Sequence, residues 1–326
     1  MTGPAIAGAP VSFGVWGPHT GPADGDGRAV LAKLAAAGYR GSELGPTGYL
    51  GDPDRTADGF AAAGLVPAGV YVGLELAAGR WTPEGRAALD LACRTLRAVA
   101  DRCGVPGVPA APIVLADEGA PGLDGPRDPR DTASGLDADA WAGAARMLTE
   151  ARAVVAGHGL PATFHPHLGT FVESGWEVER LLATTASTVV LDTGHALLAG
   201  TDPVAAVAAW GARVDHVHLK DVATAVPAQA RRGGPVPLRD WWSQANVTFG
   251  RGDVDLAGVL LALQRRDYGG WLVVEQDVAP HGGPQLTEFA QDQRHNLRTL
   301  RDLLGPPGSR ALPHPAAGST DRGPRQ

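Results

Sequence analysis

The chain of 326 residues lacks the features that mark several large classes of protein. Its two cysteines, Cys93 and Cys103, are too few for a disulfide framework. It has no apolar run of about 18 residues or more, which argues against a transmembrane helix. The N-terminal stretch has no basic segment ahead of a long apolar core, so we expect no secretion signal. A cytoplasmic location is therefore expected.

Positive charge is also in short supply. Lysine is scarce and the formal net charge is −7. No basic cluster is long enough to line a nucleic-acid groove, because the arginines are spread along expected helices, as on solvated faces. Nucleic acid and membranes are therefore not expected as partners.

Short apolar segments alternate with amphipathic segments along the chain, which indicates eight strand–helix units. The strands are expected at 11–17, 39–45, 66–76, 109–117, 160–169, 187–195, 214–222 and 269–277, and the helices at 28–38, 54–64, 83–103, 138–157, 175–184, 202–209, 254–266 and 287–304. Apolar strands that alternate with helices indicate a parallel sheet. Eight units in about 300 residues predict a (β/α)8 TIM barrel. The alternative, a doubly wound open sheet, is disfavoured because no glycine-rich phosphate fingerprint follows the first strand.

Three segments interrupt this alternation. Residues 118–136 are rich in glycine, proline and aspartate and are expected to form a loop after the fourth strand. Residues 223–253 are expected to form a long, aromatic-bearing loop after the seventh strand, suited either to a lid or to a packed surface loop. Residues 305–326 have too little apolar content to fold and are expected to be a disordered tail. A single catalytic domain is therefore expected over residues 1–304.

Ionisable residues gather at the C-terminal ends of the expected strands, the edge where TIM barrels place their active sites. Within "RVDHVHLKDV" (213–222), strand alternation puts His216, His218 and Lys220 on one face. Such a polar face is costly to bury unless it binds something. The other ionisable residues at strand ends are Glu43, His165, His167, Asp192, His195, Asp221 and Glu275.

Carboxylate and imidazole groups gathered at one edge suit a divalent metal ion. The mixture favours Mn²⁺, Co²⁺, Zn²⁺ or Fe²⁺ over Ca²⁺, and the absence of cysteine from these strands argues against a thiolate site. Each residue alone also has a structural interpretation. Asp192 and His195 suit helix caps, Glu43 suits a nearby ion pair, and His216 suits packing behind His218. Together, an aspartate, a histidine and a glutamate on three successive strand ends favour a site.

The motifs "LDTGH", "HVHLKDV", "GRGDVDL" and "GGWLVVEQD", in this order, resemble those of the xylose-isomerase-like TIM-barrel superfamily of sugar isomerases and epimerases. "SELGPTGYL", "FHPHLGTFVES" and "GRGDVDL" more closely resemble the inosose dehydratases, which remove water from 2-keto-myo-inositol. The resemblance runs from about residue 10 to residue 304. It implies a metal-dependent lyase of inositol catabolism that acts on a small polyol or ketose. Barrels of this group often form homo-oligomers, although the sequence indicates no interface.

The resemblance implies a divalent metal ion with three ligands on matching motifs: Asp192, His218 and Glu275. The family usually supplies a further glutamate from the strand that corresponds to "ATFHPH", where this chain has His165. His165 is therefore the expected fourth ligand, with His167 and Glu173 as alternatives. Exchange of a carboxylate for an imidazole shifts the preference away from Mg²⁺. Mn²⁺ or Co²⁺ is expected ahead of Zn²⁺, Fe²⁺ or Mg²⁺.

Dehydration beside a ketone requires removal of an α-proton, stabilisation of the resulting enolate and loss of a β-hydroxyl group. A divalent ion would act as the Lewis acid, and a base and an acid must lie within reach. An isomerase or epimerase on an unphosphorylated ketose would use the same groups and is the alternative. A non-catalytic barrel that binds sugar or joins a larger complex is the third interpretation. The candidate proton carriers are His167, His195, Lys220 and Glu43.

Overall fold

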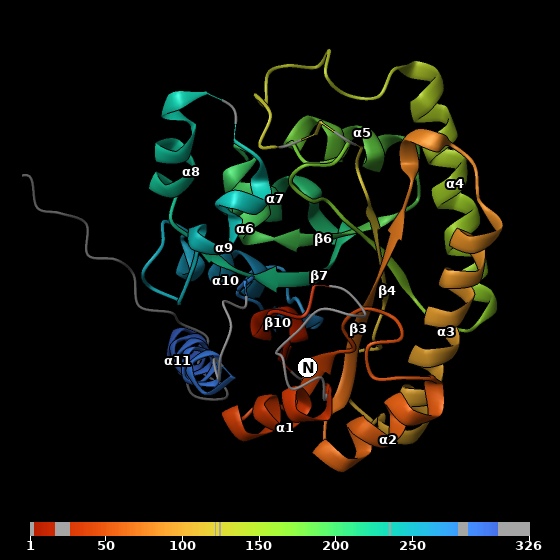
Figure 1. Cartoon of the computed structure of the whole chain (residues 1–326), viewed down its shortest axis with the longest axis vertical. Coiled ribbons are helices and arrows are strands. Elements are labelled where there is room, and N and C mark those ends of the chain that lie inside the picture. The colour runs from red at the N-terminus through yellow and green to blue at the C-terminus, as the bar shows by residue number, and fades with distance from the viewer. Residues whose placement is uncertain are drawn as a thin grey trace, which may run out of the picture.

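Eight parallel strands form a closed barrel with helices around it, which confirms the predicted (β/α)8 TIM barrel (Figure 1). The computed structural model describes residues 3–16, 27–120, 122–123, 125–234, 236–279 and 286–305. Around the barrel the strand order is β1-β10-β7-β6-β5-β4-β3-β2. These strands are β1 (Ala5–Gly8), β2 (Gly41–Glu43), β3 (Val66–Leu74), β4 (Ile113–Asp117), β5 (Ala162–His165), β6 (Thr188–Asp192), β7 (Val214–Leu219) and β10 (Trp271–Val274).

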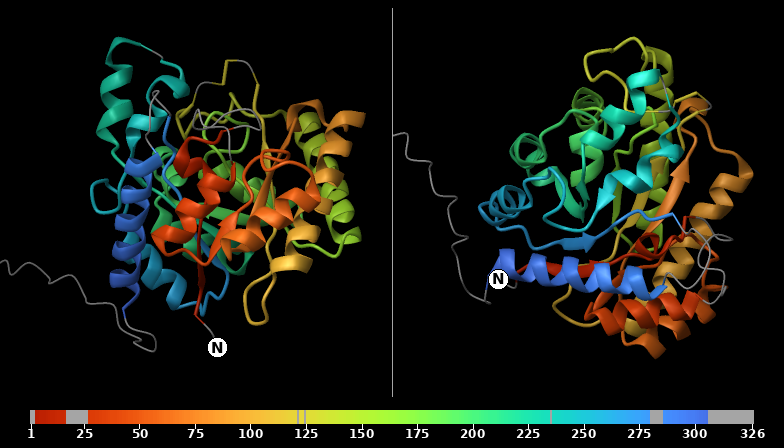
Figure 2. Two further views of the ribbon diagram at one scale, coloured as in Figure 1. Left: turned by 60° about the horizontal axis from the view of Figure 1, so that its bottom comes forward. Right: turned by 60° about the vertical axis from the view of Figure 1, so that its left-hand side comes forward.

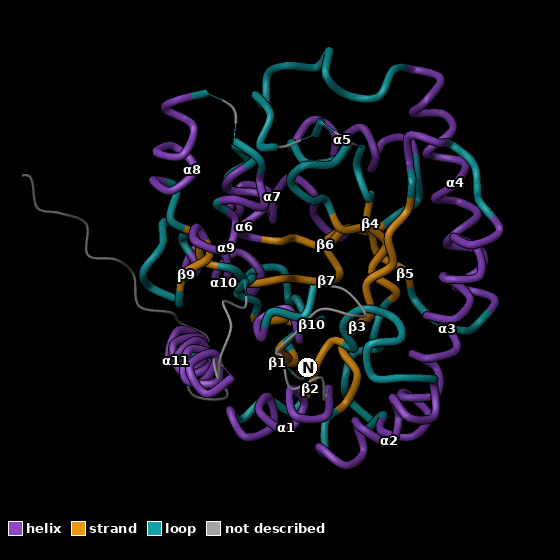
Figure 3. The backbone as a smooth tube through the Cα atoms, in the orientation of Figure 1, coloured by secondary structure: helices purple, strands orange, loops and turns teal. Residues whose placement is uncertain are grey.

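Helices cover the outside of the barrel, and the strands lie at its centre (Figure 3). They are α1 (Gly27–Ala37), α2 (Pro53–Ala63), α3 (Pro83–Cys103), α4 (Ala138–Gly157), α5 (Gly175–Thr184), α6 (Thr193–Leu198), α7 (Pro203–Trp210), α8 (Ala225–Ala230), α9 (Trp242–Ala245), α10 (Leu256–Gln264) and α11 (Leu286–Leu304). The last of these, α11, packs alongside α1 (Figure 2), which joins the two ends of the barrel domain. No helix within the described ranges combines the length and apolarity needed to cross a membrane.

The first strand lies earlier in the chain than we expected. Residues 11–17 were predicted to form it, but β1 is Ala5–Gly8, and Pro10–Phe13 form a single turn of 3₁₀ helix. Gly14 ends that turn with a positive φ of 78°. The apolar side chain of Phe13 is buried in the outer core, so burial without a strand accounts for the misleading pattern.

The barrel separates two apolar cores. The larger one lies between the strands and the surrounding helices. The smaller one fills the lower part of the barrel interior and contains Ala7, Ala68, Trp271 and Val273. Trp271 fits only because its neighbours are small: a Cβ added to Gly41 would lie 2.8 Å from the indole ring. The upper part of the interior is left to polar side chains.

The long segment after β7 builds a small substructure beside the barrel mouth. Its ends form an antiparallel pair, β8 (Asp221–Val222) with β9 (Asn246–Val247), and helices α8 and α9 lie between them. Asp221 fixes the turn after β9, because its carboxylate accepts hydrogen bonds from the backbone N–H groups of Gly250 and Gly252. Helix α8 lies away from the barrel, at the upper left of Figure 1.

The segment after β4 follows the prediction. Among the described residues of 118–136, which exclude Pro121 and Asp124, none lies in a helix or strand. The predicted tail falls almost wholly outside the described residues, because only Gly305 of it is described.

Candidate active site

The barrel brings most of the predicted polar residues together at its upper end. Glu43 ends β2, His165 ends β5 and Asp192 ends β6, and all three side chains are buried. In the strand register Asp192 pairs with His218. As strand alternation predicted, His216, His218 and Lys220 all reach the barrel interior, where they contact the carboxylates described below.

The deepest part of the cluster is a carboxylate held between two imidazoles. Oε1 of Glu43 lies 3.1 Å from Nε2 of His216 and 3.0 Å from Nε2 of His218. Burial opposes the charge of Glu43, but the two histidines outweigh it and lower its pKa. Because a carboxylate can only accept, both Nε2 atoms carry the hydrogen. His218 is therefore left with Nδ1 facing the rest of the site.

Asp192 divides its two oxygens between the fold and the site. Oδ1 caps α6 by accepting hydrogen bonds from the N–H groups of Gly194 and His195 at 3.0 and 2.9 Å. Oδ2 lies 2.7 Å from Nζ of Lys220, 3.4 Å from Nε2 of His165 and 3.7 Å from Nδ1 of His218. Asp192 therefore acts as a helix cap through Oδ1 and faces the cluster through Oδ2, so both interpretations of this residue apply.

Lys220 joins three carboxylates in the barrel interior. Its Nζ lies 2.7 Å from Oε2 of Glu275 and 3.5 Å from Oδ1 of Asp277, in addition to Asp192. Burial acts to lower the pKa of Lys220, but Asp192, Asp277 and Glu275 outweigh it and hold that pKa well above its ordinary range. Glu275 also contacts His218, with Oε2 3.2 Å from Nδ1.

Two further histidines lie beside this cluster and present opposite chemistry. Nδ1 of His167 lies 2.8 Å from the carbonyl oxygen of Leu168, which can only accept, so Nε2 of His167 keeps a free lone pair. Nδ1 of His195 instead accepts a long hydrogen bond from the N–H of Leu168, which puts the His195 hydrogen on Nε2. The two ring centroids are 3.8 Å apart. Burial lowers the pKa of His167 to about 3 and that of His195 well below its usual value, so both are neutral near pH 7.

Sequence reasoning overlooked two members of the cluster. Asp277 follows Glu275 by two positions, so the period of an extended chain could have revealed it. Burial, with Glu275 and Asp192 adding to it against Lys220, raises the pKa of Asp277 to about 6. The second is Trp242, in the segment 223–253 that was predicted only to be an aromatic-bearing loop. It donates a hydrogen bond from Nε1 to Oδ2 of Asp277 at 2.8 Å and stacks on His195, with ring centroids 4.5 Å apart.

The donor set suits a divalent cation. Donor atoms of His165, Asp192 and His218 lie within 4.8 Å of one another. Burial opposes protonation of His218, but Glu275 and Glu43 outweigh it and raise its pKa well above its ordinary value.

The charges of the cluster point the same way. Four buried carboxylates face two cations, a protonated His218 and Lys220, and four minus two leaves two negative charges. Buried charge without compensation is costly, so this excess of negative charge favours a divalent ion. His218 would lose its Nδ1 proton on binding the ion, which would reduce the excess from two negative charges to one. The buried carboxylates are Glu43, Asp192, Glu275 and Asp277.

A second group, formed by Glu43, His216 and His218, meets the same spacing. The atoms of this group that face one another are already paired, because Oε1 of Glu43 accepts a hydrogen bond from Nε2 of each imidazole, although Nδ1 of His216 has no partner among the described residues. In the outer group, Nδ1 of His218 faces Glu275 and Asp192 at 3.2 and 3.7 Å without a well-directed hydrogen bond. Nε2 of the adjacent His195 has no hydrogen-bond partner among the described residues. The outer group is therefore the better candidate for a metal site.

Glu173 lies apart from this cluster, in a network of its own. It accepts hydrogen bonds from the N–H groups of Gly169 at 2.7 Å and Arg127 at 2.5 Å. Arg127 also binds Glu177, which forms a capping box with Ser174 at the start of α5. The network ties the 118–136 loop to the β5–α5 connection, close to the mouth.

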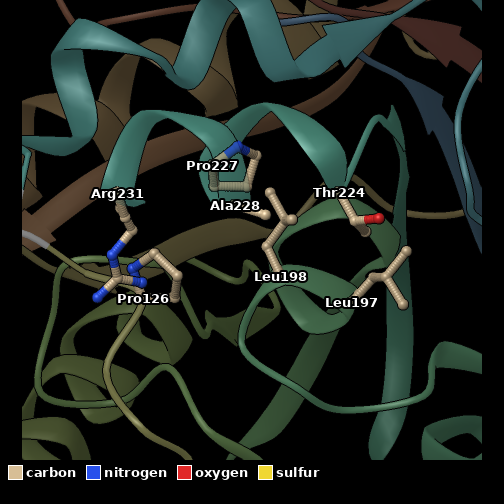
Figure 4. A pocket seen from close by; sticks show the side chains of 7 residues that line it. All are labelled: Pro126, Leu197, Leu198, Thr224, Pro227, Ala228 and Arg231. Carbon is tan, nitrogen blue, oxygen red and sulfur yellow. The ribbon is translucent and has the colours of Figure 1, made fainter. Parts of the chain in front are cut away.

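A separate pocket lies on the outer side of α6 (Figure 4). Its floor is Leu197 and Leu198, and α8 covers it with Pro227 and Ala228. None of the clustered histidines or carboxylates lines it. It is mainly apolar, so it differs in character from the mouth of the barrel.

Comparison with known proteins places these features in context. Residues 31–303 match the family described as "Xylose isomerase-like TIM barrel". The rhizopine catabolism protein MocC of Rhizobium meliloti is 33% identical over 285 residues, 84% of this chain and 82% of that protein. The inosose dehydratase of Geobacillus kaustophilus is 29% identical over 280 residues, covering 84% and 88%. A crystal structure of the protein IolI with a bound zinc atom superposes with a TM-score of 0.62 at 13% identity, covering 92% of this chain and 98% of that one.

Proposed function

The chain belongs to the xylose isomerase-like TIM barrel family, and from that premise we propose that it is a metal-dependent lyase that removes water from a keto-inositol. The observation that carries the proposal is the pairing of a metal donor set with two neutral histidines of opposite hydrogen-bonding character. Elimination needs one group that accepts a proton and one that donates. The similarity to inosose dehydratases supplies the substrate class.

His165, Asp192, His218 and Glu275 would hold the metal ion. The first three have donor atoms within 4.8 Å of one another, and Oε2 of Glu275 lies 3.2 Å from Nδ1 of His218. A divalent cation supplies Lewis acidity, which polarises a ketone and makes the neighbouring C–H bond more acidic. The mixed oxygen and nitrogen donors favour Mn²⁺, Co²⁺, Zn²⁺ or Fe²⁺ over Mg²⁺.

His167 is suited to remove the α-proton, because the lone pair on its Nε2 is free. The electrons of the C–H bond then form the enolate, and the β C–O bond breaks. The departing hydroxyl group needs a proton, which either Nε2 of His195 or the ammonium group of Lys220 can donate. Protonated oxygen leaves as water, and the enol product tautomerises to a dione.

We assign Glu43 and His216 to positioning. Glu43 accepts the hydrogen on Nε2 of His218 and so directs Nδ1 toward Asp192 and Glu275. Histidine ligands commonly have such a carboxylate partner, which fixes the tautomer and the ring orientation. His216 donates to the same oxygen from below, which orients the carboxylate.

The test is turnover of 2-keto-myo-inositol by metal-stripped protein, with and without added Mn²⁺ or Co²⁺, followed by the ultraviolet absorbance of the dione. We expect activity only with metal. The control variant is Asp202→Asn. Asp202 caps a helix as Asp192 does, but it lies at the start of α7 and not in the cluster. This variant should behave like the native protein.

The other outcomes separate the alternatives. Metal-dependent interconversion of ketose epimers without a dione would replace the lyase by an isomerase or epimerase. Metal binding with no turnover on any polyol or ketose would favour a sugar-binding barrel without catalysis. Absence of metal binding would contradict both enzymatic functions.

A further inference from the structure

Lys220 occupies the oxygens that a metal ion would need. It is one of only two lysines in a chain otherwise rich in arginine, and its side chain is buried. Nζ lies 2.7 Å from Oδ2 of Asp192 and 2.7 Å from Oε2 of Glu275. These are the same oxygens that face the imidazoles of His165 and His218. An ammonium group and a divalent cation repel each other, so both cannot hold these two oxygens at short range.

A second place for the ammonium group lies beside the first. Oδ1 of Asp277 is 3.5 Å from Nζ of Lys220, is buried, and accepts no hydrogen bond from any residue that the structure describes. Oδ2 of the same carboxylate is held by Nε1 of Trp242 at 2.8 Å, which fixes the orientation of Asp277. A small movement of the flexible lysine chain would therefore give Nζ a full partner.

We propose that Lys220 is an exchangeable internal cation, which binds Asp192 and Glu275 in the metal-free protein and moves to Asp277 when a divalent ion takes those carboxylates. The inference rests on the proposed metal site. It explains why the carboxylate of Asp277 is buried with one oxygen unused. It also makes Lys220 and Asp277 positioning residues whose effects on metal affinity depend on each other.

The dependence can be measured with a double-mutant cycle. Calorimetry of the full-length, metal-stripped protein with Mn²⁺ would compare the native chain with Lys220→Met, Asp277→Asn and the double variant. We expect Lys220→Met to bind Mn²⁺ about tenfold more tightly, because no ammonium group competes. Asp277→Asn should weaken binding about tenfold in the native background, since Lys220 then has nowhere to go, and less than twofold in the Lys220→Met background.

A matched control removes the other lysine. Lys33 lies on α1 and is not among the mouth residues, so Lys33→Met should leave the affinity for Mn²⁺ unchanged. If Asp277→Asn weakens binding equally with and without Lys220, the two residues act only through their charges and the exchange is overturned. If the native protein binds no metal at all, the proposed function fails as well, so the two failures are distinguishable.

A second measurement needs no variant that could misfold. Protein labelled with ¹⁵N at lysine Nζ should give two signals, and titration with diamagnetic Zn²⁺ should displace only the one from Lys220. Assignment follows from the Lys33→Met protein, which keeps the Lys220 signal alone. A Lys220 signal that stays in place while calorimetry records zinc binding would overturn the exchange.

Discussion

Two groups of buried carboxylates lie near the barrel mouth, and the protein treats them differently. In the group at the start of α5, Glu173 and Glu177 are fully supplied with donors by Arg127 and by backbone N–H groups. In the barrel interior, Asp192 and its neighbours compete for one lysine. Burial alone therefore does not identify a functional carboxylate. Under the proposed function, what distinguishes the interior group is the negative charge that the protein leaves unbalanced.

Removing a charge from the interior group should have the largest effect on metal affinity. We expect Asp192→Asn to lower metal affinity about 1,000-fold, equivalent to about 4 kcal/mol, because Oδ2 is the central oxygen of the donor set. The amide oxygen can still cap α6, so the fold should persist. Calorimetry and a circular dichroism melt would report the two effects. Unchanged affinity would remove Asp192 from the ligands.

The opposite result is expected for the group at α5. Arg127→Met should lower the free energy of unfolding by about 3 kcal/mol, because it leaves two buried carboxylates without their cation. Metal affinity should not change. Denaturant unfolding would measure the loss, with Arg130→Met as control, since the side chain of Arg130 is 89% exposed. A fall in metal affinity would show that the two groups act as one site.

Glu43→Gln tests whether the deep carboxylate positions or binds. We expect metal affinity to fall about tenfold, the range of a partner that orients a ligand, because a neutral acceptor holds His218 less firmly. Calorimetry, together with ¹⁵N spectra of the His218 tautomer, would measure both effects. A loss as large as that of Asp192→Asn would place the ion at Glu43, His216 and His218 instead.

The smallest effect is expected for Glu173→Gln. The glutamine amide keeps a hydrogen-bond acceptor but carries no charge beside Arg127, so the free energy of unfolding should fall by about 1 kcal/mol. Metal affinity should stay within about twofold of native, a difference below about 0.4 kcal/mol. This variant also tests the alternative that Glu173 ligates the metal. A tenfold fall in calorimetrically measured affinity would restore that alternative.

The sequence predicted the architecture because the alternation of apolar strands and helices repeats through the whole chain. It also placed His216, His218 and Lys220 on one face, since that conclusion needs only the period of a strand. The first strand was misplaced because β1 is made of small residues. Three of its four residues are alanine or glycine, and Ala7 is small where Trp271 fills the barrel, so the strand carries only Ile6 as a bulky residue to signal it.

Local patterns could not predict the partnerships within the site. Glu43 meets its two histidines across 173 and 175 positions of the chain, and Trp242 reaches Asp277 across 35. Only the closed barrel brings them together. The same limit applies to Glu173, whose partner Arg127 lies 46 residues earlier, in a loop that carries no periodic pattern.

Trp271 and its small neighbours close the lower end of the barrel. Ligands can therefore reach the interior only from the upper end of the barrel. Under the proposed function, metal ion, substrate and exchanging water would all pass the same mouth, so the ion would have to bind before the substrate. A bound substrate would then lie across the exit and slow the departure of the ion.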